Sequence, residues 1–129
     1  GIAAGLPALT RAEKLQRKAG KVGFDWNDPR AVLAKLREEI NEIEAELDTG
    51  SRDAQEDELG DVLFCVVNLA RHLDLDSEMA LKRTNIKFQQ RFAHIEDRLA
   101  EQGIPFAEAP LEQMEALWVE AKQSPKAAD

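Results

Sequence analysis

The sequence predicts an all-α fold, an antiparallel bundle of about four to five helices. Three observations support this prediction. Residues that favour helices dominate the 129-residue chain. No segment shows the sustained alternation of apolar and polar residues that strands show, and β-branched residues are scattered. The connections between the expected helices are short, and short connections favour antiparallel neighbours.

A clear start signal marks each of the first two expected helices. Thr10 and Glu13 have the spacing of a capping box, so the first helix is expected to begin at Thr10. Asp28 can cap the second helix, and Pro29 suits its first turn. Gly50 is a good stop for that helix.

Three further helices follow along the chain. The third is predicted over residues 53–73, and its apolar arc is so wide that we expect it to be the most buried helix. The fourth is predicted over residues 78–102 and stops at Gly103. The fifth is expected to start at Pro110.

The length of the chain suits one domain. Residues 1–9 are predicted to form a linker, residues 10–123 the helical domain and residues 124–129 a flexible tail. Residue 1 is Gly, so we expect a processed chain or a piece of a longer protein.

Composition excludes several classes of function. The chain has 17 Lys and Arg against 25 Asp and Glu, a net charge of −8, which argues against a broad nucleic-acid-binding face. Its longest mostly apolar run, residues 63–70, is too short to span a membrane. Cys65 is the only cysteine and cannot form an internal disulfide, so a reducing cytoplasm is the expected compartment.

Two of the expected helices carry pairs of acidic residues. Glu39 and Glu42 are spaced i, i+3 on the second helix, and Glu58 and Asp61 have the same spacing on the third. Each pair therefore shares a helix face. Glu39 and Glu58 border the apolar stripes of their helices, so the four carboxylates converge if these helices pack side by side.

Converging carboxylates repel, because two charges 5 Å apart cost about 3 kcal/mol at an effective dielectric constant of 20. A divalent cation removes that cost. A site made of oxygen ligands without His or Cys favours Mg²⁺, Mn²⁺ or Ca²⁺ over zinc. Acidic residues are abundant here, however, and ordinary solvated helix faces also produce such pairs, so spacing alone leaves both interpretations open.

Basic and aromatic residues on later helices suggest a phosphate-containing ligand. Lys87 and Arg91 are spaced i, i+4, and such groups beside a metal centre suit a polyphosphate, although a solvated face is the alternative. Trp118 could stack on a base and Lys122 could meet a phosphate, although Trp118 also fits a core position. Asn68 could hydrogen-bond a ligand or orient a carboxylate.

Five short motifs together carry a resemblance to a known family. They are Val22-Gly-Phe-Asp-Trp26, Glu38-Glu39-x-x-Glu42, Glu58-Leu-Gly-Asp61, Asn68-Leu-Ala-Arg-His72 and Asn85-x-Lys87-Phe88-x-x-Arg91-Phe92. The set resembles MazG-type nucleoside triphosphate pyrophosphohydrolases of the all-α NTP pyrophosphatase superfamily, over roughly residues 9–122. The acidic motifs are shared across the superfamily, whereas the first and last motifs are specific to MazG. Residues 7–11 resemble the segment before the C-terminal domain of tandem members, so we interpret the chain as a C-terminal MazG domain.

The resemblance implies a Mg²⁺-dependent enzyme, with Mn²⁺ as a possible substitute, that forms dimers through its helices. The implied reaction converts nucleoside triphosphates into monophosphate and pyrophosphate by attack of metal-activated water on the α-phosphorus. The implied metal ligands are Glu39, Glu42, Glu58 and Asp61, and the implied substrate contacts are Lys35, Lys87, Arg91, Trp118 and Lys122. Glu38, next to the ligand Glu39, is the candidate general base, although it points about 100° away from Glu39 on an ideal helix.

Two other classes of function remain as alternatives. The chain could be a catalytically silent nucleotide-sensing or dimerisation module of a longer tandem protein. It could also be a purely structural helical bundle. The four intact acid positions favour the enzyme. The sequence does not identify the preferred base or sugar.

Overall fold

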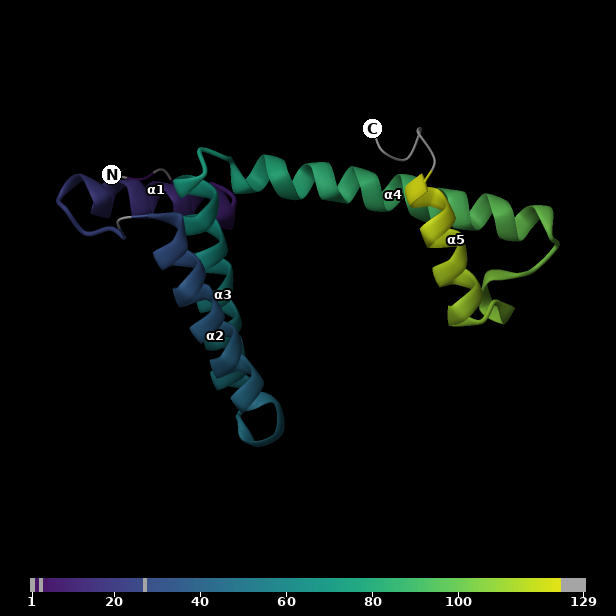
Figure 1. The fold of residues 1–129 in the computed structure, drawn as a ribbon, viewed down its shortest axis with the longest axis horizontal. Helices are drawn as coiled ribbons and strands as arrows, with labels where there is room; N and C mark the ends of the chain where they lie inside the picture. The colour runs from purple at the N-terminus through teal and green to yellow at the C-terminus, as the bar shows by residue number, and fades with distance from the viewer. Residues whose placement is uncertain (1, 3, 27, 124–129) are drawn as a thin grey trace. The chain divides into compact units, whose positions relative to one another are not determined.

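A computed structural model describes residues 2, 4–26 and 28–123. These described residues form five α-helices and one 3-10 helix, without a strand (Figure 1). The elements are α1 (Ala8–Lys21), α2 (Pro29–Thr49), α3 (Arg52–His72), α4 (Ser77–Glu101), η1 (Phe106–Glu108) and α5 (Leu111–Gln123). The all-α prediction is confirmed. None of the described helices is both long and apolar enough to cross a membrane.

The chain divides into two compact units, Gly1–Ala80 and Leu81–Asp129. The first unit contains α1, α2, α3 and the first turn of α4, and the second contains the rest of α4, η1 and α5. The single domain over residues 10–123 stays a prediction, and the predicted tail over residues 124–129 lies outside the described residues.

In the first unit, α2 and α3 lie side by side as an antiparallel hairpin, and α1 packs against α3 (Figure 1). The Asp28 carboxylate accepts a hydrogen bond of 3.0 Å from the Ala31 backbone N–H and so caps α2, as predicted. Gly50 ends that helix, also as predicted. The Ser51 hydroxyl then caps α3 by accepting from the Ala54 N–H at 3.1 Å.

The start of α1 differs from the prediction. The helix begins at Ala8, after Pro7, and no side chain caps it. The Pro7 carbonyl already accepts a hydrogen bond of 2.9 Å from the Arg11 N–H, so Thr10 lies inside the helix. The predicted capping box of Thr10 and Glu13 is therefore wrong, because the backbone of Pro7 starts the helix earlier than a Thr10 cap would allow.

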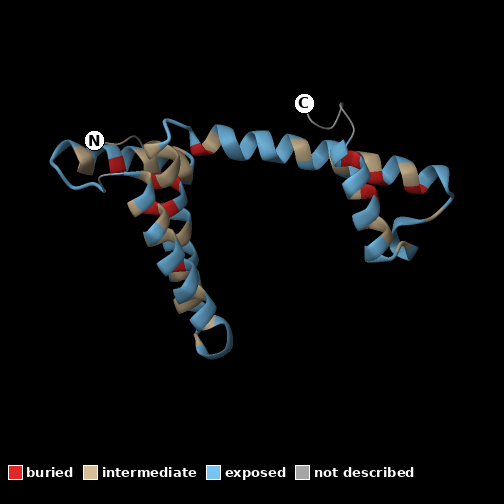
Figure 2. Cartoon of the chain, viewed as in Figure 1, coloured by how far each residue is buried: buried red, intermediate tan, exposed pale blue. Residues whose placement is uncertain are grey.

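Buried residues of the hairpin gather at the end that meets α1 (Figure 2). Val32, Cys65 and Val67 are buried there, and no residue from 40 to 64 is buried. The wide apolar arc that made α3 the helix expected to be most buried is therefore not covered along its outer part, where Leu59 and Leu63 are 49% and 48% exposed. Because α1 packs at the other end of α3, α2 alone covers this outer part within the unit, and it covers only one side of the apolar arc.

The second unit has its own small core. Ile95 and Leu99 of α4 pack with Leu117 of α5, and these three residues are buried. The chain leaves α4 through Gly103, whose φ of +68° favours glycine, so the predicted stop at this residue is confirmed.

Gly60 offers a direct test of the packing around α3. It lies inside the helix, and a Cβ atom added there meets nothing within 4 Å. Gly60→Ala should therefore raise the free energy of unfolding by about 0.5–1 kcal/mol, because glycine carries an entropic cost in helices. Urea denaturation measures this change.

Gly23→Ala is the matched control, because Gly23 has a φ of +89° that alanine adopts only with strain. This variant should lower the free energy of unfolding by about 1 kcal/mol. Loss of stability in Gly60→Ala would contradict the open surroundings of Gly60.

Candidate active site

Three carboxylates meet between α2 and α3. One oxygen from each of Glu39, Glu58 and Asp61 lies within 4.8 Å of the others. Glu39 comes from α2, and the other two residues lie one turn apart on the facing helix. Glu39 is buried, Glu58 is half-buried and Asp61 is exposed, so the cluster extends from the helix interface to solvent.

The donor atoms of this cluster suit a hard divalent cation. Glu39 Oε2 and Glu58 Oε2 are buried and have no hydrogen-bond partner among the described residues. Unpaired buried carboxylate oxygens are costly. Carboxylate oxygens are the ligands that Mg²⁺ and Ca²⁺ prefer, so the chemistry of the cluster fits such a cation.

Glu42, the fourth predicted ligand, lies next to Glu58. The pKa of Glu58 is raised to about 7, first because the Glu42 side chain hydrogen-bonds it, then because of burial and the negative charges of Glu42, Glu39 and Asp61. The cluster therefore retains a proton at a pH where an ordinary carboxyl has lost it. A cation bound at these carboxylates would compete with that proton.

Lys35 lies one turn before Glu39 on α2 and pairs with it. The distance from Lys35 Nζ to Glu39 Oε1 is 3.1 Å, and that to Glu38 Oε2 is 3.9 Å. The hydrogen bond to Glu39, with the charge of the same carboxylate, raises the pKa of Lys35. The Glu38 side chain is 68% exposed and points away from the buried interface. Its assignment as general base stays a prediction.

The second unit brings together two other predicted residues. The Arg91 guanidinium lies over the Trp118 ring, 5.3 Å from its centroid. Phe88 packs on the same tryptophan with 5.5 Å between ring centroids. Lys87 is half-buried and Lys122 is exposed. Lys87, Arg91, Trp118 and Lys122 thus belong to the second unit, whereas Lys35 and the acids belong to the first.

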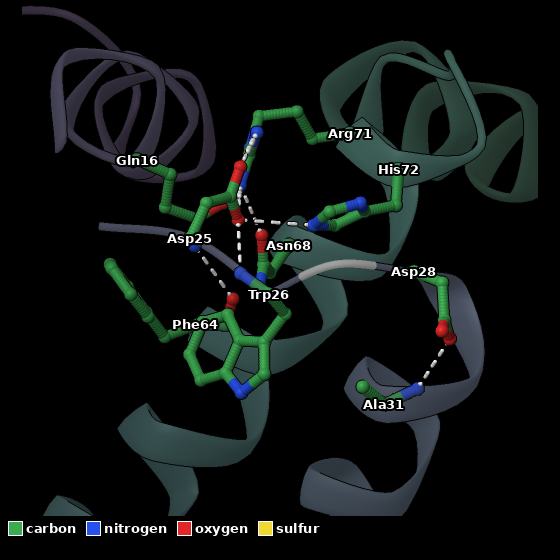
Figure 3. A network of polar contacts seen from close by, with 9 residues as sticks. All are labelled: Gln16, Asp25, Trp26, Asp28, Ala31, Phe64, Asn68, Arg71 and His72. Atoms are coloured by element: carbon green, nitrogen blue, oxygen red, sulfur yellow. Dashed lines mark hydrogen bonds and ion pairs between the residues drawn. The ribbon is translucent and has the colours of Figure 1, made fainter. Parts of the chain in front are cut away.

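A network centred on Asp25 joins the loop before α2 to the end of α3 (Figure 3). The Asp25 carboxylate accepts hydrogen bonds of 2.8 and 2.6 Å from the Arg71 guanidinium. It also lies 3.1 Å from His72 Nε2 and accepts from the Trp26 N–H at 2.8 Å. The Arg71 guanidinium lowers the pKa of Asp25 to about 2 by hydrogen bonding to its ionised form.

Asn68 belongs to the same network and is only 1% exposed. Its Oδ1 accepts a hydrogen bond of 2.6 Å from Arg71 Nη2. This contact favours an orienting role, and direct binding of a ligand by Asn68 stays a prediction. Sequence reasoning missed the pairing of Asp25 with Arg71 because the two residues are 46 positions apart. The only signal was that each lies in a motif of the resemblance.

The fold and the acidic cluster define a helical protein with a candidate centre for a divalent cation. Residues 27–96 match the family model of the MazG nucleotide pyrophosphohydrolase domain. The chain therefore belongs to this family, which confirms the resemblance. Its assignment as a C-terminal domain stays a prediction.

Curated relatives support the same membership. The chain is 42% identical over 120 residues to a nucleoside triphosphate pyrophosphohydrolase of Escherichia coli, covering 92% of this chain and 46% of the relative. It is 40% identical over 117 residues to the nucleoside triphosphate pyrophosphohydrolase/pyrophosphatase MazG of Thermotoga maritima, covering 91% and 45%. It is 33% identical over 88 residues to the uncharacterized protein YpjD of Bacillus subtilis, covering 60% and 79%. The chain thus spans about half the length of the first two relatives.

The Asp25 network generates a prediction about stability and pH. Asp25→Asn should lower the free energy of unfolding at pH 7 by about 1 kcal/mol, since charge-assisted hydrogen bonds at a partly exposed site are lost. The folded-state pKa is about 2 against an ordinary 3.8. The contribution of Asp25 is therefore present above pH 3.8 and lost as the pH falls through 2. Denaturation of the wild type and of Asp25→Asn at a series of pH values from 7 to 2 measures the difference between their free energies of unfolding.

Asp28→Asn is the matched control, because Asn caps a helix as well as Asp does. It removes the same charge and should change stability little. A stability gap for Asp25→Asn that stays constant from pH 7 to pH 2 would contradict the assignment.

Proposed function

We propose that this chain hydrolyses nucleoside triphosphates to monophosphate and pyrophosphate. The observation that carries the proposal is the acidic cluster between α2 and α3, with two buried carboxylate oxygens that lack hydrogen-bond partners among the described residues. Membership of the MazG family supports it, as does similarity to the nucleoside triphosphate pyrophosphohydrolases of E. coli and T. maritima.

Mg²⁺ is the cation that we assign to the cluster, with Mn²⁺ as a substitute. Its ligands are Glu39, Glu42, Glu58 and Asp61, whose oxygens match the preference of hard cations. When bound, the cation supplies charge neutralisation for the triphosphate and acidifies water.

The chain's own residues bind and orient the substrate in this proposal. The substrate contacts that the family resemblance implies, namely Lys35, Lys87, Arg91 and Lys122, supply positive charge for the triphosphate. Such charges stabilise the negative charge that develops when water attacks the α-phosphorus and pyrophosphate leaves. Trp118, already stacked with a guanidinium, offers its ring to the base. Buried Asn68 accepts a hydrogen bond from the Arg71 guanidinium and so helps to orient that side chain. Glu38 accepts the proton of the attacking water.

We further propose that the protein acts as a homodimer in the cytoplasm. Large apolar residues on the outer half of the α2–α3 hairpin remain exposed: Ile40, Leu47, Leu59 and Leu63. A groove of about 400 Å³ next to Leu47 and Leu59 is lined by these two residues and Ile43, together with Arg52, Gln55 and Glu56. Exposed apolar side chains with polar residues around them are typical of an interface, and a second copy of the hairpin offers the same set. The free thiol of buried Cys65 supports a reducing compartment.

Product analysis tests the proposed reaction. The chain is incubated with each common NTP and dNTP in Mg²⁺ and then in EDTA, and products are separated by anion-exchange chromatography. We expect monophosphate and pyrophosphate, lost with EDTA. Glu39→Gln and Asp61→Asn should each lower the rate at least about 100-fold while leaving the helical circular dichroism signal unchanged.

Two matched controls accompany these variants. Glu44→Gln on α2 and Asp57→Asn on α3 remove exposed carboxylates from the same helices and should retain the rate of the wild type. Diphosphate and orthophosphate as products would contradict the assigned bond. Mg²⁺-dependent nucleotide binding without any product would support a silent nucleotide-sensing module instead.

A further inference from the structure

The exposed side of α1 gathers basic residues in an otherwise acidic chain. The helix carries five Lys and Arg residues and one acidic residue, Glu13, whereas the whole chain has a net charge of −8. We propose that this side of α1 binds a small oligophosphate anion through its phosphate charges, without a divalent cation. The site goes beyond the proposed function, because it shares no residue with the acidic cluster or with the implied substrate contacts.

The packing of α1 turns a row of lysines away from the hairpin. Gln16 is buried, and its Nε2 donates a hydrogen bond of 2.9 Å to the Phe64 carbonyl of α3. At about 100° per residue, Lys14, Lys18 and Lys21 lie about 140–160° around the helix from that buried glutamine. All three lysines are exposed. They therefore form one row on the side of α1 opposite its contact with α3.

A hollow of about 370 Å³ lies along this row. Its lining residues are Ile2, Lys14, Arg17, Lys18 and Lys21. A concave site of this size suits a small molecule. The lining contains four cations, no carboxylate and no aromatic ring, so it attracts negative charge and offers a nucleobase nothing to stack on. Phosphate groups are therefore the part of a ligand that this hollow recognises.

Three of the four lining cations lack a counter-charge. Arg17 Nη2 lies 2.8 Å from Glu13 Oε1, so this ion pair neutralises Arg17. The described residues form no ion pair with Lys14, Lys18 or Lys21. Like charges on neighbouring turns of one helix face repel one another. A short oligophosphate carries several negative charges and neutralises the row together.

Stabilisation of the helix terminus does not account for the whole row. Cations in the last turn of a helix interact favourably with its dipole, and Lys18 and Lys21 lie in that turn of α1. Lys14 lies a turn earlier, where this effect has faded. Its charge therefore adds to the hollow without stabilising the end of the helix.

A small anion suits the row better than a nucleic acid does. From Lys14 to Lys21 the row is only about 10 Å long, at a rise of 1.5 Å per residue. A long polyanion would extend past the row and meet the field of a chain with a net charge of −8. An oligophosphate of a few phosphate groups meets the lysines alone.

The test is binding of inorganic triphosphate to the full chain in EDTA, measured by isothermal titration calorimetry. Without a cation the acidic cluster repels this probe, so binding reports on the basic surface. Lys14→Gln/Lys18→Gln should bind about tenfold more weakly than the wild type, because two exposed charge pairs are lost. Lys82→Gln/Arg83→Gln on α4 is the matched control, since it removes two exposed positive charges and should retain the affinity of the wild type.

Two further measurements sharpen the test. Lys14→Gln alone lies outside the last turn of α1 and should weaken binding about threefold, with an unchanged helical circular dichroism signal. ATP in the same buffer should bind no more tightly than inorganic triphosphate, because the lining holds no aromatic ring for the base.

Three outcomes would overturn the inference. The first is failure of the wild type to bind triphosphate in EDTA, and the second is equal affinity of the wild type and folded Lys14→Gln/Lys18→Gln. The third is tighter binding of ATP, or of a single-stranded oligonucleotide, than of triphosphate. None of these measurements contains a divalent cation, so each outcome leaves the proposed hydrolysis to its own test.

Discussion

The antiparallel contact between α2 and α3 decides where every acid of the candidate centre lies. It places Glu39 against Glu58 and Asp61, with Glu42 beside them. Like charges gathered at a half-buried interface are unfavourable unless something positive joins them. The buried carboxylate oxygens without partners, the raised pKa of Glu58 and the Lys35–Glu39 pair all reflect this excess of negative charge. A divalent cation bound among these carboxylates would neutralise part of this negative charge.

The Asp25 network helps to fix this helix contact. Arg71, near the end of α3, holds Asp25 in the loop that leads to the Asp28 cap of α2. The loop and the end of α3 are thereby tied at the end of the hairpin where its buried residues gather. The acids lie about three to four turns further along the hairpin from this tie. This gives the loop motif a physical role that is separate from contact with a ligand.

Local features were predictable from the sequence, and long-range ones were not. The Asp28 cap, the Gly50 stop and the i, i+3 spacing of the acids depend on neighbouring residues, and the structure brings Glu39, Glu58 and Asp61 together as the spacing suggested. The start of α1 was missed because a backbone carbonyl, that of Pro7, replaced a side-chain cap. The Asp25–Arg71 pair was missed because no spacing rule joins residues so far apart. The exposure of Leu59 and Leu63 was missed because apolar periodicity shows which face needs covering, not what covers it.

Anomalous diffraction from crystals of the full chain grown in Mn²⁺ shows whether a divalent cation binds between α2 and α3. We expect a strong anomalous peak within coordination distance of Glu39, Glu58 and Asp61. Saturating Mn²⁺ without a peak at these carboxylates, in crystals that preserve the α2–α3 contact, would overturn the assignment of the cluster as a metal centre.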